Sequence, residues 1–322
     1  MQTYVLRRIF LGLITVALVS VIIFVFLRVA PGDVALIVAM QGDDTIDPNM
    51  IDPLLLETIR EELGLHYSLP VQYLRWMGGM LTLDWGESFY TGAIVYEEFL
   101  KRAPVTLQLA ISTITISVLL GIPAGVIMAL RQDTWADYLV RLVSLVGLSI
   151  PSFWIGTLMI VVGMLYFEWS PRLEYVAPWD DFSANMSMFF FPAVATASVS
   201  MATKARMMRS TMLEVLRQDY IRTAHAKGLR YVVVVWRHAV KNAMLPVITI
   251  IGIQIAFVVG GSVIMETIFQ LPGMGTLLIR SMNQRDYEVV QSFVAVVSTW
   301  IVFTNLMVDL AYAWLDPRIR FD

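Results

Sequence analysis

Six long runs without Asp, Glu, Lys or Arg limit this chain to a membrane-embedded fold. Each run supplies the roughly 18 to 20 apolar residues that a helix needs to cross a hydrocarbon core of about 30 Å. The runs are Ile9–Leu27, Ala103–Leu130, Leu142–Phe167, Phe182–Thr203, Asn242–Met265 and Val289–Val308. A transmembrane barrel is excluded, because its strands alternate and are about half as long. We therefore expect an all-α polytopic membrane protein with six transmembrane helices.

The distribution of charge predicts how these helices are oriented. If both ends of the chain face the cytoplasm, that side receives 15 of the 23 Lys and Arg residues, nine of them between Lys204 and Lys241. The opposite side receives 19 of the 26 Asp and Glu residues. An excess of basic residues marks cytoplasmic loops, so both termini are predicted to be cytoplasmic. The first run is longer than a signal peptide's apolar region and no small-residue cleavage site follows it, so we expect an uncleaved span.

The spans predict four parts. They are a cytoplasmic tail with the first helix (residues 1–30), an extracytoplasmic segment (31–102), a five-helix domain with a cytoplasmic loop at about 204–241 (103–315) and a cytoplasmic tail (316–322). The extracytoplasmic segment contains an acidic stretch, Asp43–Asp47, and a helix predicted near Leu54–Leu63 that ends at Gly64. It is too short and broken for a solute-binding domain, so we expect it to cap the outer mouth of the bundle. Pro123 and Pro151 either kink the second and third spans or serve packing alone.

The longest polar and basic interruption in the second half runs from Leu213 to Pro246. Helical spacing predicts one amphipathic helix with Leu213, Leu216, Tyr220 and Ala224 on one side and Glu214, Arg217, Gln218, Ile221 and His225 on the other. Gly228 is expected to end it, because glycine adopts positive φ easily. A second run then turns back to Pro246, which is expected in the first turn of the next membrane helix. The small residues Ala224, Ala226 and Gly228 would let another protein approach closely.

No pattern in the chain indicates catalysis or metal binding. None of its four lysines follows a glycine, so a phosphate-binding Gly-Lys loop is absent from the sequence. The three histidines are scattered, there are no cysteines, and no serine lies in a Gly-x-Ser-x-Gly motif. We therefore expect no catalytic residue, no bound metal and no cofactor in this chain.

A few polar residues near the predicted spans are candidates for a translocation pathway or gate. Asp309 is expected to be the one ionisable residue deep in a span, with Asn305 one turn earlier, and its role is either an anchor or a pathway group. Glu266 ends the fifth span and is followed by a turn-rich stretch with Pro272 and Gly273 that can form a gate. Gln254, Gly260 and Gly261 in the fifth span are candidates to face the pathway, with close helix packing as the alternative for the two glycines.

The basic interruption resembles a known signature. The run Asp219 to Leu229, DYIRTAHAKGL, followed by WRHA and NAMLP, is similar to the EAA loop of binding-protein-dependent ABC importer permeases. The first permease subunit of the dipeptide and oligopeptide branch, the B-type subunit of the peptide and nickel family, shares further segments. These are YVLRRIF, RVAPGD, ELGLHYSLPVQYLRW, SIPSFWIG, METIFQLPGMGTLL, RDYEVVQ and VDLAYAWLDPRIRF. Arg222-Thr223-Ala224 stands where the wider family has Glu-Ala-Ala, and the spacing to Leu245-Pro246 is longer, both habits of the peptide branch.

The resemblance implies a type I importer fold in the inner membrane of a prokaryote. It implies four partners: a homologous second permease, two ABC ATPases that hold ATP and Mg²⁺, and an extracytoplasmic solute-binding protein; no nucleic acid is expected. It also implies that a cytoplasmic coupling helix docks on the ATPase. The residues expected to couple are Asp219, Tyr220, Arg222, Thr223, Ala224, Lys227 and Gly228.

Peptides are the expected cargo. The lipid bilayer is the expected surroundings of the helices. The same machine with oligosaccharide or nickel-chelate cargo stays open. Two rivals from other classes are an ion-coupled carrier that uses Asp309 and a scaffold subunit that transports nothing. The carrier leaves the cytoplasmic helix unexplained, and a plain basic loop explains the charge of that segment but not its helix-stop-helix pattern.

Overall fold

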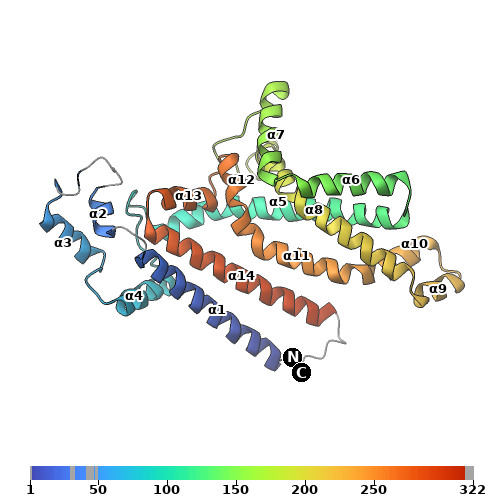
Figure 1. Ribbon diagram of the computed structural model, residues 1–322, viewed down its shortest axis with the longest axis horizontal. Helices are drawn as coiled ribbons and strands as arrows, with labels where there is room; N and C mark the ends of the chain where they lie inside the picture. Colours follow the sequence, from blue (N-terminus) through green and yellow to red (C-terminus); the bar gives the residue numbers. More distant parts are fainter. Residues whose placement is uncertain (1, 30–32, 41–46, 48–49, 316–322) are drawn as a thin grey trace. The chain divides into compact units, whose positions relative to one another are not determined.

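The computed structural model describes residues 2–29, 33–40, 47 and 50–315, with their side chains except at residues 2–5 and 309–315. Within these residues the regular structure is helical (Figure 1), apart from an isolated antiparallel bridge between Glu87 and Ile94. The all-α prediction is confirmed. By its contacts the chain forms two compact units, residues 1–104 with 273–322 and residues 105–272. By contacts, the last helices therefore group with the first ones. The predicted topological parts, with a boundary at residue 103, stay a prediction.

The first unit contains two long antiparallel helices, α1 (Gln2–Val29) and α14 (Tyr287–Leu315), which lie side by side in Figure 1. A Cβ atom on Gly12 would lie 2.7 Å from Cγ1 of Val302, so glycine allows the close approach of the two helices. Toward the other end of the pair, Leu27 packs with Tyr287 and Val290. The shorter helices of this unit are α2 (Val34–Ala39), α3 (Pro53–Glu62), α4 (Leu69–Thr82) and α13 (Met274–Asn283).

The helix expected near Leu54–Leu63 is confirmed as α3. The Asp52 carboxylate accepts a hydrogen bond from the backbone N–H of Leu54 at 2.9 Å, and Pro53 occupies the first turn. Both features favour a helix start. Gly64 follows the end of α3 with φ +64°. Residues 43–46 of the acidic stretch lie outside the described residues.

The second unit is built around α8 (Phe182–Leu216). This helix packs against α6 (Trp135–Ser149), α7 (Ser152–Phe167) and α11 (Lys241–Gly261). α5 (Val95–Leu130) also approaches α8, because a Cβ atom on Gly125 would lie 2.6 Å from the carbonyl oxygen of Ala205. Four short elements complete the unit: α9 (Asp219–Ala226), α10 (Tyr231–Val233), the π-helix η2 (Val234–Val240) and α12 (Val263–Ile268). Figure 1 shows α9 and α10 beside the end of α8.

Five helical stretches among the described residues are long and apolar enough to cross a membrane. They are Leu6–Val29, Val95–Leu130, Phe182–Leu216, Tyr231–Gly261 and Tyr287–Val308. The predicted span Leu142–Phe167 is instead a pair of helices, α6 and α7, bent by 99°, and there are six spans when this pair counts as one. Pro151 explains the bend. It has no N–H group, and it holds Ile150 in an extended conformation with ψ 125°.

The position of Pro246 differs from the prediction. The backbone is helical from Tyr231 through η2 to Gly261, so Pro246 lies inside a continuous helix and not in its first turn. The prediction was wrong because Arg230 to Asn242 do not turn back before the membrane helix. They wind into it as a π-helical segment, and the single N–H that proline lacks is a local loss that a membrane helix tolerates.

Candidate functional site

The first part of the candidate site is the short helix α9 and the turn that ends it. Helix α8 ends at Leu216, and Gln218 in an extended conformation (ψ 148°) starts α9 as a separate helix. At the other end, the N–H of Gly228 donates to the carbonyl of His225 at 2.9 Å, and the N–H of Leu229 donates to the carbonyl of Ala224 at 3.4 Å. With Gly228 at φ +75°, these bonds form a Schellman motif. The predicted stop at Gly228 is confirmed.

The face that α9 turns toward its own unit differs from the predicted face. Ile221 is 2% exposed and Ala224 is 5% exposed, whereas Tyr220 is 42% exposed. The prediction ran one helical phase through Leu213 and Tyr220, but the extended residue Gln218 resets that phase. Ile221 and Ala224 pack in a cluster of apolar residues from α5, α8, η2 and α11. Its other buried members are Val126, Ala129, Met208, Met212, Val234, Val235, Ala239, Ala243 and Val247.

The opposite face of α9 is polar and exposed. Four of the residues predicted to couple are exposed on α9, namely Asp219, Tyr220, Arg222 and Thr223, and two more, Lys227 and Gly228, are exposed in the turn that ends it. Ala224 does not belong to this face, because it is buried against the unit. The Tyr220 hydroxyl accepts a hydrogen bond from Nδ2 of Asn242 at 2.9 Å, so the exposed face is also tied to the start of α11. The helix is thus held by its apolar side and by one polar contact.

The π-helix η2 supports α9 and has no clear signal in the sequence. Val234, Val235 and Ala239 of η2 are buried in the same apolar cluster as Ile221. The rings of His225 and Tyr231 stack at 6.1 Å between centroids, which joins the end of α9 to α10. π-Helical segments inside longer helices occur frequently at functional sites.

The second part of the candidate site is a buried polar cluster in the middle of the unit. Lys204 of α8 is fully buried, and its Nζ donates to the Ser117 hydroxyl of α5 at 3.0 Å and to Oε1 of Gln254 of α11. Nε2 of Gln254 donates in turn to the hydroxyl of Ser200 at 3.0 Å. Three helices thus meet on one ammonium group that contacts neutral oxygens. A charge in such a place requires hydrogen-bond partners.

This cluster corrects the prediction that Asp309 is the one ionisable residue deep in a span. The sequence grouped Lys204 with the cytoplasmic basic residues because it directly follows the charge-free run. The observed helix α8 continues to Leu216 and buries it. The backbone of Asp309 belongs to α14, but its side chain lies outside the described residues; Asn305 is exposed.

Glu266 is another fully buried ionisable residue in this unit. Its Oε1 accepts a hydrogen bond from the Thr106 hydroxyl at 2.7 Å and from the Ser262 hydroxyl at 3.0 Å. Glu266 lies on the short helix α12, which follows the end of α11 at Gly261. The stretch after α12 contains Pro272, which is half-buried, and Gly273, which is buried and starts α13. Roles of Gln254, Glu266, Pro272 and Gly273 in a pathway or gate stay predictions.

Among the described residues of the first unit, Asp286 is a buried acidic group outside the spans. The Ser88 hydroxyl donates to Oδ2 of Asp286 at 2.6 Å, and Asp286 is 1% exposed. Burial raises the pKa of this carboxyl above its ordinary value, while the hydrogen bond from Ser88 acts in the opposite direction. Among the described residues, no group of three or more His, Asp or Glu side chains is placed to hold a metal ion.

The known proteins that this chain resembles are components of membrane transport systems. Residues 121–321 match the model of the family described as binding-protein-dependent transport system inner membrane component, and residues 1–110 match the model of its N-terminal part. A probable peptide ABC transporter permease of Sinorhizobium fredii is 37% identical over 327 residues, covering both chains completely. The dipeptide transport system permease protein DppB of Alkalihalophilus pseudofirmus is 34% identical over 341 residues, again over both complete chains. A putative peptide permease of Brucella ovis is 36% identical over 99% of each chain.

Proposed function

Because this chain belongs to the family of binding-protein-dependent transport system inner membrane components, we propose that it is the permease subunit of an ABC importer and forms the pathway for di- and oligopeptides. The peptide cargo is inferred from the printed names of relatives that match over the full length. The observation that carries the mechanism is α9, a capped helix with a buried apolar face and an exposed polar one.

In this proposal α9 couples the permease to an ATPase subunit. Its exposed face, with Tyr220, Arg222 and Thr223, contacts the ATPase, while Ile221 and Ala224 hold the helix on its own unit. A helix held in this way moves together with the elements below it when its partner moves. The chain itself binds no nucleotide in this scheme, and the ATPase partners hold ATP and Mg²⁺.

The assembly and the orientation complete the proposal. A second, homologous permease subunit, two ATPases and an extracytoplasmic solute-binding protein are the partners, and both termini of this multi-pass chain face the cytoplasm. The basic residues between Lys204 and Lys241 support this orientation by the positive-inside rule. The helix α9 lies within this basic segment, so in the proposed orientation it is on the side where ATP is available.

The close alternative is an ABC importer of the same composition that transports an oligosaccharide or a nickel chelate. Ligand identification on the co-purified solute-binding protein decides between these cargoes. An ion-coupled carrier that works alone through Asp309 has less support, since it leaves the coupling helix without a purpose.

Cross-linking tests the proposal directly, because the sequence has no cysteine and a single introduced thiol is then the only one in this chain. Thr223→Cys places a thiol on the exposed face of α9, and Thr267→Cys places an exposed one on α12 as the control. A thiol-to-amine linker is expected to join the Thr223→Cys chain to the ATPase and to leave the Thr267→Cys chain unjoined. The reverse pattern, or peptide uptake by this chain in vesicles without any ATPase, would contradict the proposal.

A further inference from the structure

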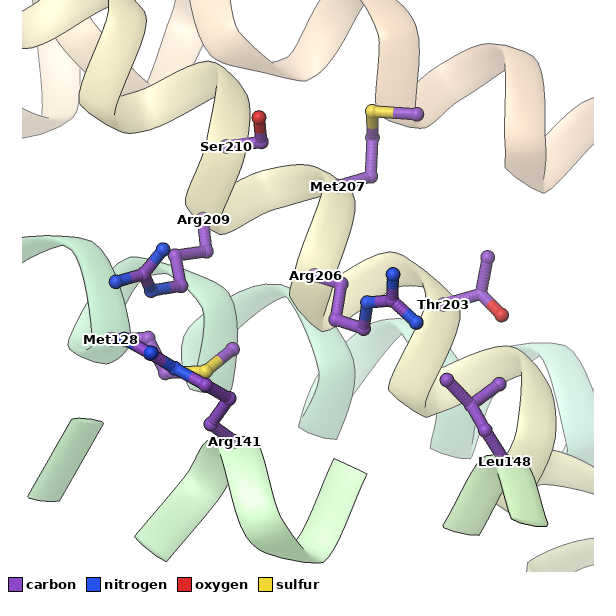
Figure 2. Close-up of a pocket in the computed structure, with 8 residues that line it drawn as sticks. All are labelled: Met128, Arg141, Leu148, Thr203, Arg206, Met207, Arg209 and Ser210. Carbon is purple, nitrogen blue, oxygen red and sulfur yellow. The ribbon is translucent and has the colours of Figure 1, made fainter. Parts of the chain in front are cut away.

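A pocket in the second unit lies beside the arginines of α6 and α8 and plays no part in the coupling scheme. Its volume is about 520 Å³, within the range of small-molecule sites. Figure 2 shows its lining: Met128 of α5, Arg141 and Leu148 of α6, and Thr203, Arg206, Met207, Arg209 and Ser210 of α8. We propose that this pocket binds the phosphate headgroup of an anionic phospholipid from the cytoplasmic leaflet.

The arginines leave positive charge without an internal partner. The Asp137 carboxylate pairs with both Arg141 (2.6 Å) and Arg209 (2.8 Å), so this trio keeps one net positive charge. Arg206 adds a second positive charge, and it forms no ion pair or hydrogen bond with any described residue. Arg131 and Asp133, in the turn before α6, cancel each other. The site therefore carries a net charge of about +2, which suits the negatively charged phosphodiester of a lipid headgroup.

One donor nitrogen in the site also lacks a partner. Nε of Arg141 is buried and forms no hydrogen bond with the described residues, although Nη2 of the same side chain binds Asp137. A buried N–H without an acceptor costs free energy, and an anionic oxygen beside it would remove that cost. In Figure 2 the side chains of Arg141 and Arg209 point toward each other from α6 and α8.

The depth of the pocket matches a headgroup and not the centre of the bilayer. At 1.5 Å per residue, Arg206 lies about 36 Å along α8 from Phe182, beyond a hydrocarbon core of about 30 Å. The other end of the pocket is formed by Leu148 and Thr203, which lie deeper in the membrane. An apolar deep end below a basic outer end fits a lipid, which has both parts, better than a free phosphate. Basic pockets between membrane helices are known to bind such headgroups.

The inference uses the orientation proposed above, but its test needs no transport. The complex containing the full chain is incubated with vesicles of phosphatidylcholine that contain a photoactivatable phosphatidylglycerol, and the cross-linked chain is quantified. Arg206→Gln is the test variant, since Arg206 has no internal contact to lose. Arg217→Gln is the matched control, since Arg217 is an exposed arginine that directly follows the end of α8 and lies outside the pocket.

We expect Arg206→Gln to weaken phosphatidylglycerol binding about fivefold, the effect of one basic side chain near an anionic surface, and Arg217→Gln to leave it unchanged. Equal labelling of the two variants would overturn the proposal. Competition by inorganic phosphate as strong as by phosphatidylglycerol would show that the site takes a free anion, and cross-linking from position 206 to another subunit would show that a protein covers it. Either result also overturns the lipid assignment. Failure of ATP-driven uptake, by contrast, would count against the coupling role of α9 and would leave this binding result intact.

Discussion

Nζ of Lys204 donates a hydrogen bond to the hydroxyl of Ser117 across 3.0 Å, joining α8 to α5 inside the second unit. The two residues are 87 positions apart in the chain. The ammonium group contacts neutral oxygens there and forms no ion pair among the described residues, so it is a charge whose burial is offset by hydrogen bonds alone. Removing the charge and removing one of its acceptors should therefore have different effects on stability.

Lys204→Met is expected to leave the thermal unfolding midpoint of the detergent-solubilised complex unchanged or slightly higher. Replacing a buried charge by an apolar side chain of similar volume is often neutral or stabilising. Gln254→Leu is expected to lower stability by roughly 2 to 3 kcal/mol, because it removes an acceptor and leaves the charge in place. Equal losses in both variants would contradict this account.

The positive φ of Gly228 predicts a graded response. A Cβ atom at this position would meet no atom within 4 Å, so the cost of substitution is backbone strain and not a clash. Gly228→Val is expected to cost about 1 to 2 kcal/mol in the local stability of the turn and to reduce the ATPase activity stimulated by the solute-binding protein. Gly228→Asn is the control, since Asn tolerates this conformation better. Equal activity of both variants would show that the turn does not matter for coupling.

Ile221 and Arg222 separate the buried face of α9 from the exposed one. Ile221→Ala is expected to remove roughly 2 to 4 kcal/mol of packing, and to expose α9 to proteolysis. Arg222→Ala is expected to change stability by no more than about 0.5 kcal/mol but to weaken recovery of the ATPase with the complex. Affinity purification and limited proteolysis of the two variants measure both effects. Normal ATPase recovery with Arg222→Ala would argue that this side chain is not in the contact.

Asp137 is expected to contribute far more to the stability of the protein than Asp219, whose ion pair is exposed. Asp137→Asn leaves Arg141 and Arg209 without their buried partner, and we expect a loss of about 2 kcal/mol, less than for a fully buried pair because both arginines reach solvent. Asp219→Asn removes an ion pair with Arg222 that is exposed on both sides, and its expected effect is below about 0.5 kcal/mol. Comparable unfolding midpoints for the two variants would contradict the burial argument.

Asp286 predicts a dependence of stability on pH in the first unit. Burial raises the pKa of its carboxyl in the folded state. A raised pKa means that the stabilising contribution of this group is complete below its unfolded pKa, about 3.9, and is lost as the pH rises through the folded pKa. Asp286→Asn keeps an acceptor for the Ser88 hydroxyl, so it should make the unfolding midpoint fall less between pH 4 and pH 7. Asp52→Asn, at the exposed cap of α3, is the control, and an unchanged pH profile for Asp286→Asn would be evidence against the prediction.

Local sequence signals were sufficient to predict a helix end where a single residue sets the conformation of its own backbone. Gly228 ends α9 and Gly64 follows α3, as expected, because both lie at positive φ. For Pro151 the sequence left a kink and plain packing open, and the structure has a full break between α6 and α7 there. The phase of α9 could not be predicted in the same way. Gln218 leaves the helical conformation, and no strong local signal marks it, so the periodic pattern was carried across the break.

The amino-acid sequence by itself determined that the chain is helical, that it spans the membrane and where its longest polar and basic segment lies, since charge-free runs, proline and glycine act over neighbouring residues. Only the tertiary structure decided that Ile221 faces inward, that Lys204 is buried and that Arg141 and Arg209 share Asp137. These arrangements depend on groups brought together from distant helices. The energy of a buried polar group is set by the partners that packing supplies, and those partners are not its neighbours along the chain.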